Sequence, residues 1–246
     1  MVWVDKIVAT EGIYTDASNE LRNEAKKRFD ELIKQYQKDI SKDIKLEYKL
    51  RKGKIYHELD GFARTIGAMM IITGAHGISG FEEYWIGSNA FKIVTYSICP
   101  VITVRHDFQV GKNIERILVP IDSSSETLQK LPFIAKIAAV FGSEVHLVTT
   151  HYSQLKSIQR IADNLADQAE KYLAKQAIKL VRDSIISNDI SKTTIDYALK
   201  LDADLISIMT EQETPANILL GPRAQELVNQ SPVPILSIHP VEHFCL

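Results

Sequence analysis

Two stretches of this chain are copies of each other, and this internal repeat is the feature that most limits the folds available to it. "FARTIGAMMIITGA" (62–75) aligns with "YALKLDADLISIMT" (197–210), and "GSNAFKIVTYSICPVITV" (87–104) aligns with "GPRAQELVNQSPVPILSI" (221–238). Each copy has a helix end, an apolar run, a loop, a helix that begins at a glycine, and a proline before a second apolar run. The 246 residues therefore contain two similar domains.

The second copy shows the order of the elements most clearly. Its apolar runs are "RILVPI" (116–121), "EVHLVTT" (144–150), "DLISIM" (204–209) and "VPILSI" (233–238), and a short "SIIS" lies between the second and third. Helices are predicted between them, the first from Ser124 to Phe141 and a longer one that carries apolar residues as far as Ala177 and Leu180. Continuous apolar strands that alternate with amphipathic helices are typical of parallel sheets covered on both faces. We predict an α/β fold made of two tandem, doubly wound parallel-sheet domains.

The polar segment "RHDFQVGKN" (105–113) marks the boundary between the copies, which gives domain 1 residues 1–110 and domain 2 residues 111–246. Domain 1 has no counterpart of the strand and helix at 115–142. Its first residues, "MVWVDKIVAT", are interpreted as a second strand, and 20–36 as the long helix. Either the opening unit is missing from the chain as given, which we predict, or the first copy is rebuilt. The alternative that "WVDKIVAT" is itself the central strand remains open.

Net charge, cysteine content and the lengths of the apolar runs limit the kinds of function expected of this chain. The formal net charge is −2, which gives no reason to expect a nucleic-acid surface or an anionic membrane partner. Cys99 and Cys245 form neither a zinc site nor a disulfide framework, which favours reduced thiols in the cytoplasm. No apolar run approaches the ~20 residues that span a bilayer, and the first residues do not resemble a signal peptide. We expect a cytoplasmic protein.

Glycines cluster in "TGAHGISGFEEYWIGSNAF" (73–91), where Gly74, Gly77 and Gly80 precede Gly87 and Ser88. Glycine lets the backbone approach a ligand closely, so that successive N–H groups can face one anion. A helix that starts after Gly87 adds unsatisfied N–H groups and the positive end of its dipole. The segment follows a predicted parallel strand, where open α/β sheets bind ligands, and it matches neither a Walker A nor a Rossmann pattern. The alternative is a tight loop in which Ser88 merely caps the helix.

The pattern Gly-x-x-Gly, nine residues, then Gly-Ser resembles the nucleotide loop of universal stress proteins. "CPVITVR" (99–105), "RILVPIDSSSE" (116–126) and "DGFARTIGAMMIITGAHG" (60–77) resemble other parts of that family, so the resemblance covers nearly the whole chain as a tandem pair. It implies that the first copy binds ATP through five residues, with weak hydrolysis at most and with Mg²⁺ left open. These residues are Gly74, Gly77, Gly87, Ser88 and Asn89. It also implies that the last strands of the copies, 101–105 and 233–238, pair as a pseudo-dimer.

The second copy departs from this pattern at its loop. Asp122 follows "LVPI" and resembles the family's acidic residue, so it is a remnant of a site. The loop, however, contains only Gly221, and Pro222 stands where the first copy has Ser88. Glu211 and Glu213 add negative charge where a phosphate needs donors, and proline has no N–H to donate. We predict that this copy does not bind nucleotide.

Nothing else in the sequence indicates catalysis. The histidines are scattered, the serines after Asp122 have no base spaced to activate them, and no metal site is predicted. Met69 and Met70 lie in an apolar run and are expected in the core. Two hypotheses remain, a stress-response regulator that binds an adenine nucleotide, and a nucleotide-free scaffold for interaction and dimerisation. A homodimer is left open.

Overall fold

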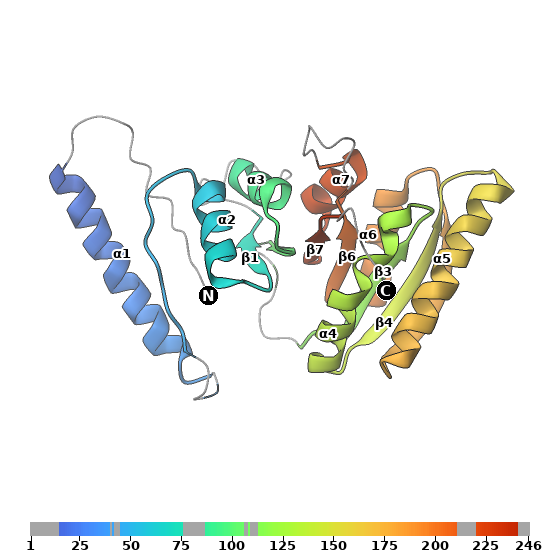
Figure 1. Cartoon of the computed structure of the whole chain (residues 1–246), viewed down its shortest axis with the longest axis horizontal. Coiled ribbons are helices and arrows are strands. Elements are labelled where there is room, and N and C mark those ends of the chain that lie inside the picture. Colours follow the sequence, from blue (N-terminus) through green and yellow to red (C-terminus); the bar gives the residue numbers. More distant parts are fainter. Residues whose placement is uncertain are drawn as a thin grey trace. The chain divides into compact units, whose positions relative to one another are not determined.

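The apolar runs of both copies pair as strands of one sheet (Figure 1). The computed structural model describes residues 15–39, 41, 45–75, 87–105, 108, 113–210 and 220–240. In this part of the chain the strands are β1 (Ile71–Gly74), β2 (Val101–Val104), β3 (Arg116–Ile121), β4 (Glu144–His151), β5 (Lys179–Ile186), β6 (Leu205–Met209) and β7 (Ile235–Ile238). They lie in the order β1-β2-β7-β6-β3-β4-β5.

The sheet is parallel within each copy and antiparallel where the copies meet. β1 pairs with β2, and β7, β6, β3, β4 and β5 pair in turn, all in parallel. β2 runs antiparallel to β7, with Ile102 opposite Leu236. This confirms both the α/β fold and the predicted pseudo-dimer through the last strands. Each copy thereby covers the strand edge that the other would leave unpaired.

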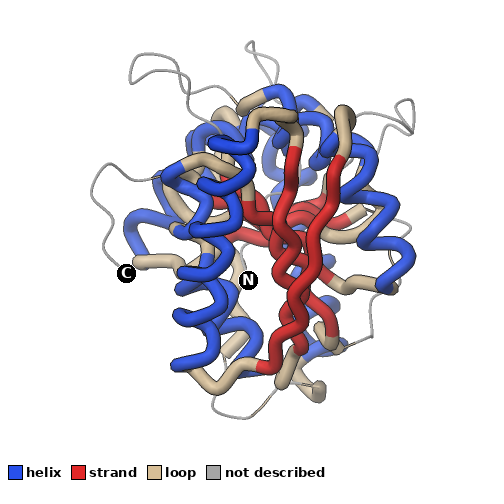
Figure 2. The backbone as a smooth tube through the Cα atoms, turned by 90° about the vertical axis from the view of Figure 1, so that its right-hand side faces the viewer, coloured by secondary structure: helices blue, strands red, loops and turns tan. Residues whose placement is uncertain are grey.

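Helices cover the strands on both sides (Figure 2). The helices of the whole described part of the chain, those of its first 62 residues included, are α1 (Thr15–Tyr36), α2 (Ile55–Ile66), α3 (Ser88–Tyr96), the 3₁₀ turn η1 (Ser125–Leu128), α4 (Leu131–Phe141), α5 (Lys156–Lys175), α6 (Ile190–Leu201) and α7 (Pro222–Gln230). Alternate residues of β3, such as Ile117 and Val119, form the main core with α4 and α5. α6 lies against the opposite face, where Thr194 borders a small hollow beside Leu118. Burial on both faces explains the continuous apolar sequence of β3.

The two copies repeat the same backbone hydrogen bonds. The N–H of Ala75 donates to the carbonyl of Val104 at 2.8 Å, and in the second copy Thr210 donates to Ile238 at 2.8 Å. The helices α3 and α7 both follow a glycine and bury matching apolar residues, which are Ala90, Ile93 and Val94 in one and Ala224, Leu227 and Val228 in the other. The predicted duplication is therefore visible in the structure residue by residue.

The chain divides into two compact units, Met1–Phe62 and Ala63–Leu246, and the sheet belongs to the second. In the first unit Phe29 of α1 is buried and stacks on Tyr48, with 5.1 Å between the ring centroids. Leu21 and Tyr36 of the same helix are about half exposed. Residues 1–10, interpreted as the second strand of the first copy, lie outside the described residues, and the missing opening unit and the domain boundary at 110/111 stay predictions.

Two predictions about the second copy are wrong. The long helix α5 ends at Lys175, because Ala177 adopts a left-handed φ of 56° and the N–H of Ile178 turns back to the carbonyl of Leu173. Leu180 then lies in β5, opposite Val145. The strand thus contains most of the short "SIIS" run and begins five residues before it. The helix expected from Ser124 is a 3₁₀ turn followed by α4.

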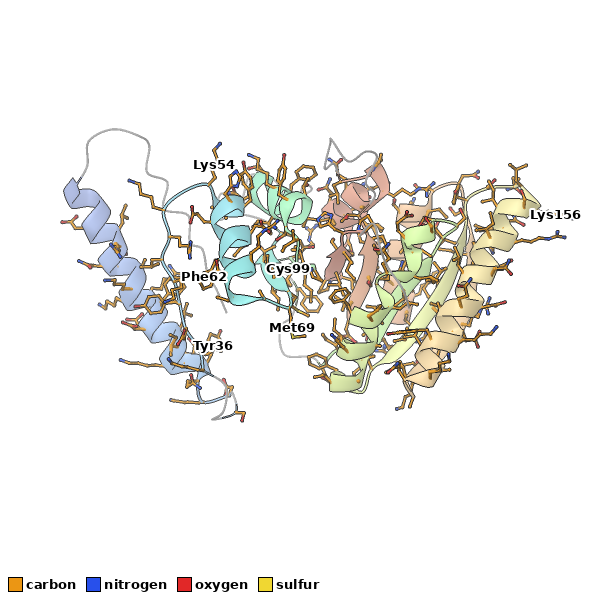
Figure 3. All side chains as sticks on the ribbon, viewed as in Figure 1. Tyr36, Lys54, Phe62, Met69, Cys99 and Lys156 are labelled. Carbon is orange, nitrogen blue, oxygen red and sulfur yellow. The ribbon has the colours of Figure 1, made fainter. Side chains whose placement is uncertain are left out.

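Met69 is not in the core. It lies two residues before β1 and is 67% exposed (Figure 3), whereas Met70 is partly buried against the core. The matching residue of the second copy, Asp204, accepts hydrogen bonds from the N–H groups of Glu115 and Arg116, which lead into β3. The first copy therefore has a methionine where the second has the carboxylate that holds its central strand.

No helix in the described ranges combines the length and the apolar character that a membrane crossing requires.

The left-handed conformation of Ala177 gives a stability prediction. Replacement by glycine removes the contact between Cβ and the carbonyl that this conformation imposes, so Ala177→Gly should raise the free energy of unfolding by ~1 kcal/mol. Ala174→Gly, three residues earlier in the exposed last turn of α5, is the matched control and should lower it by ~1 kcal/mol. Urea unfolding of both variants measures the difference. Destabilisation by both would contradict the helix end described here.

Candidate functional site

The ends of the glycine loop are fixed at the carboxyl edge of β1 and β2. β1 ends at Gly74, and the next residue, Ala75, donates its N–H to the carbonyl of Val104 at 2.8 Å. At the other end of the loop, Gly87 donates its N–H to the carbonyl of Ala75, also at 2.8 Å. These bonds bring Gly74 and Gly87 together at this edge, while Gly77 lies outside the described residues.

The helix α3 starts directly from this fixed point. Gly87 is its N-cap, and Ser88 and Asn89 are its first two residues. The first N–H groups of a helix have no acceptor within it, and they lie at the positive end of its dipole. Ser88 is exposed and Asn89 half-buried, so these donors lie at or near the surface. The arrangement suits an anion such as a phosphate group.

Two details of the predicted loop need correction. Ser88 is not the helix cap, because Gly87 occupies that position with φ −59° and ψ 143°. These angles are open to any L-residue, so the backbone conformation at Gly87 does not require glycine. The N–H of Gly87 is used by Ala75, which leaves Ser88 and Asn89 as the residues of this group with N–H groups that the helix does not use.

In the second copy Asp122 is engaged by its own chain. Its carboxylate accepts hydrogen bonds from the N–H and the hydroxyl of Ser124, the former at 3.0 Å. The N–H of Asp122 donates to Thr127 Oγ1 at 3.3 Å, and Lys130 Nζ donates to the same oxygen at 3.2 Å. Lys130 is only 3% exposed. The Asp122 carboxylate is therefore bonded to Ser124 of its own chain, and the buried Lys130 donates to the same threonine as the Asp122 N–H.

The charges of Lys130 and Asp122 each favour the ionised form of the other. Burial lowers the pKa of Lys130 to about 8, against the opposing effect of the Asp122 carboxylate. Burial by itself would raise the pKa of Asp122, but the charge of Lys130 and the hydrogen bonds from Ser124 and Thr127 outweigh it, so the pKa of Asp122 falls below its ordinary value. Both groups are charged at pH 7, and Asp122 has an internal cation in place of a ligand.

Side chains also bridge the neighbouring strand ends of the second copy. The guanidinium of Arg223, at the start of α7, lies 4.3 Å from the centre of the Tyr152 ring. The Tyr152 hydroxyl lies 3.0 Å from Ser123 Oγ, at the end of β3. Pro222 begins α7 and has no N–H to offer. That the second copy does not bind nucleotide stays a prediction, and Glu211 and Glu213 lie outside the described residues.

The sequence analysis missed Lys130, Tyr152 and Arg223. Lys130 stands in "LQKLPFIAKIAAVF" (128–141), which also contains the exposed Lys136, so the sequence alone did not distinguish the buried lysine from the exposed one. Tyr152 and Arg223 are 71 positions apart in the sequence, and only the fold brings them together.

Comparison with known proteins gives consistent matches. A model of the universal stress protein family matches residues 2–105 and again 113–239. Universal stress protein YxiE of Bacillus subtilis (strain 168) is 34% identical over 88 residues, which are 35% of this chain and 60% of that curated relative. This chain therefore spans less than two thirds of the relative's length.

Solved structures of low sequence identity share the fold. A universal stress protein from Archaeoglobus fulgidus DSM 4304 aligns with a TM-score of 0.73 and 16% identity, over 98% of this chain and 85% of that one. A universal stress protein described as putative, from Pseudomonas aeruginosa UCBPP-PA14, aligns with a TM-score of 0.59 and 14% identity, over 94% and 80% of the two chains.

The buried lysine predicts an alkaline pH dependence. The folded protein releases the Lys130 proton near pH 8, whereas the unfolded chain keeps it until near its ordinary pKa of 10.5. The unfolded state binds more protons between these values, so the free energy of unfolding should rise by up to ~1.4 kcal/mol per pH unit above about pH 8. Urea unfolding from pH 7.5 to 9.5 measures this slope. Lys130→Met should flatten it, and an equal slope in wild type and variant would contradict the assignment.

Proposed function

Because the chain belongs to the universal stress protein family, we propose that its first copy binds an adenine nucleotide, ATP, through the loop between β1 and α3. In this proposal the protein is a stress-response regulator that changes its interactions when ATP is bound, with weak hydrolysis of ATP at most. Mg²⁺ bound with the nucleotide, a homodimer and a cytoplasmic location remain predictions.

One observation carries the proposal. The hydrogen bond from Gly87 to Ala75 fixes the start of α3 beside the end of β1. This directs the unsatisfied N–H groups of a helix to the carboxyl edge of a parallel pair of strands, where α/β sheets bind ligands. The second copy has the same glycine, Gly221, but a proline follows it.

Each predicted residue has a separate role. The N–H groups of Ser88 and Asn89 would donate to phosphate oxygens, and the Ser88 hydroxyl would add a third donor. Gly74, at the end of β1, would let the phosphates approach the backbone because it has no side chain in the way. Gly77 is proposed from its sequence spacing alone. Asp122 takes no part in nucleotide binding, because its partners are Ser124 and the buried Lys130.

A nucleotide-free scaffold is the second candidate function, and two observations favour it. The copies are joined through β2 and β7, and the second copy satisfies its own Asp122. A protein whose repeats serve only to present a joined surface would show both features. It would not show saturable binding of ATP.

The first copy's site is tested by calorimetric titration with ATP in the presence of Mg²⁺. Ser88→Pro is the informative variant, since it removes the N–H and reproduces the Gly-Pro helix start that α7 tolerates. Ser88→Ala keeps the N–H and loses only a hydroxyl donor, so it should weaken binding by about fivefold. Because a hydrogen bond to a charged group is stronger, Ser88→Pro should weaken binding by a further factor of about ten or more.

Pro222→Ser in the second copy is the control and should leave the affinity unchanged. Equal affinities of wild type and Ser88→Pro would rule out this helix start as the site. If the wild type shows no heat of binding and no rise in melting temperature with ATP, the scaffold is the correct function. At 100 times its dissociation constant the ligand would add ~2.7 kcal/mol to stability.

A further inference from the structure

His239 follows β7 of the second copy, and its imidazole contacts the first copy. Nε2 lies 2.6 Å from the carbonyl oxygen of Val94 in α3, and Nδ1 lies 2.6 Å from Thr210 Oγ1 at the end of β6. Burial lowers the pKa of His239, although the hydrogen bond to Val94 acts in the opposite direction. The lowered pKa favours the neutral ring. In one neutral tautomer, Nε2–H donates to the carbonyl and Nδ1 accepts from the hydroxyl. The side chain therefore links the end of β6 to α3 with both nitrogens satisfied.

The carbonyl that His239 binds is one that α3 cannot satisfy by itself. α3 ends at Tyr96, so the carbonyl of Val94 is among the last four of the helix, which have no N–H partner within it. Val94 is 0% exposed, and a buried carbonyl without a partner is costly. The histidine supplies a donor from the other copy. It thereby holds the carboxyl half of a helix that is only nine residues long.

Thr210 fixes the imidazole in turn. It is 1% exposed, its N–H donates to the carbonyl of Ile238 at 2.8 Å, and its hydroxyl lies 3.2 Å from the same carbonyl. The hydroxyl has one proton, and at 2.6 Å Nδ1 is the nearer of its two acceptors, while the backbone N–H bond to Ile238 fixes Thr210 beside the ring. This orients the ring so that Nε2 faces α3.

This link is built in one direction only. The repeat alignment places Arg105, Ala75 and Val228 at the positions that match His239, Thr210 and Val94. Alanine has no hydroxyl, so the first copy cannot form the same imidazole–hydroxyl pair toward α7. The link is directed at α3, whose first residues are Ser88 and Asn89, and not at α7, whose start is Pro222.

We infer that His239 is a positioning residue for the nucleotide site of the first copy, acting across the repeat interface through Val94 without touching the ligand. The inference rests on the proposed function, since it concerns the same site. A short helix held at its carboxyl half keeps its N–H donors aimed in one direction, and loss of the anchor lets the helix start move away from the phosphates. The second copy, in which Asp122 is bonded to Ser124, then contributes to binding by holding α3 in place.

Two variants of similar size distinguish loss of the hydrogen bond to Val94 from a change in side-chain volume. His239→Gln keeps an N–H donor near the position of Nε2 and can still reach Val94, whereas the shorter amide of His239→Asn lies near the position of Nδ1 and cannot. Calorimetric titration with ATP should give an affinity within about twofold of wild type for His239→Gln and about fivefold weaker for His239→Asn. Amide hydrogen exchange of α3 without nucleotide should be faster in His239→Asn than in His239→Gln.

Thr210 supplies a second pair if His239→Asn does not fold. Thr210→Val removes the hydroxyl at nearly constant shape and should weaken ATP binding, while Thr210→Ser keeps the hydroxyl and should restore it. Faster exchange with unchanged affinity would show that His239 only stabilises the fold and would overturn the inference, as would unchanged exchange and affinity together. A wild type that binds no ATP contradicts the proposed function, and the inference about the nucleotide site falls with it. The exchange rates then decide separately whether His239 anchors α3.

Discussion

The antiparallel pairing of β2 with β7 is the contact on which the rest of this structure depends. Both strands are short and apolar, and each would leave an open edge if its copy stood alone. Ile102 and Leu236 face each other across the pair and are both buried. The pairing turns two domains into one sheet, and it brings His239 of one copy to Val94 of the other.

The copies keep the same backbone and differ in the chemistry at their carboxyl edges. Equivalent hydrogen bonds and equivalent glycine caps show that the duplication preserved geometry. The second copy fills its edge with Lys130 beside Asp122 and with Arg223 over Tyr152, whereas α3 of the first copy begins with Ser88. In our account the first copy binds the nucleotide, and the second copy holds α3 of the first in place.

Much of this fold follows from the sequence because its strands are unbroken apolar runs. β3 and β4 were predicted almost to the residue, since burial on both faces requires such runs. Only the end of β5 was recognised, as the short "SIIS", because β5 is an exposed edge strand with mixed polarity and the helical spacing of α5 continues into Leu180. The left-handed turn at Ala177 that separates the two has no sequence signal, because alanine is an unusual residue there.

The site was only partly predictable for a different reason. Gly87 and Ser88 stand next to each other, so their place at a helix start follows from local pattern. The partners of Asp122 and the link from His239 to Val94 depend on the fold, which brings together residues far apart in the sequence. A lysine or histidine in a sequence gives no sign that it will be buried against such a partner.

The most direct test of the central claim, that the first copy alone binds nucleotide, is the number of ATP molecules bound by each chain. Equilibrium dialysis of the purified protein with labelled ATP at saturation measures this number without any substitution. Our account predicts one nucleotide per chain, because in the second copy Asp122 accepts hydrogen bonds from Ser124 and α7 begins with Pro222. Two nucleotides per chain, or none, would contradict it.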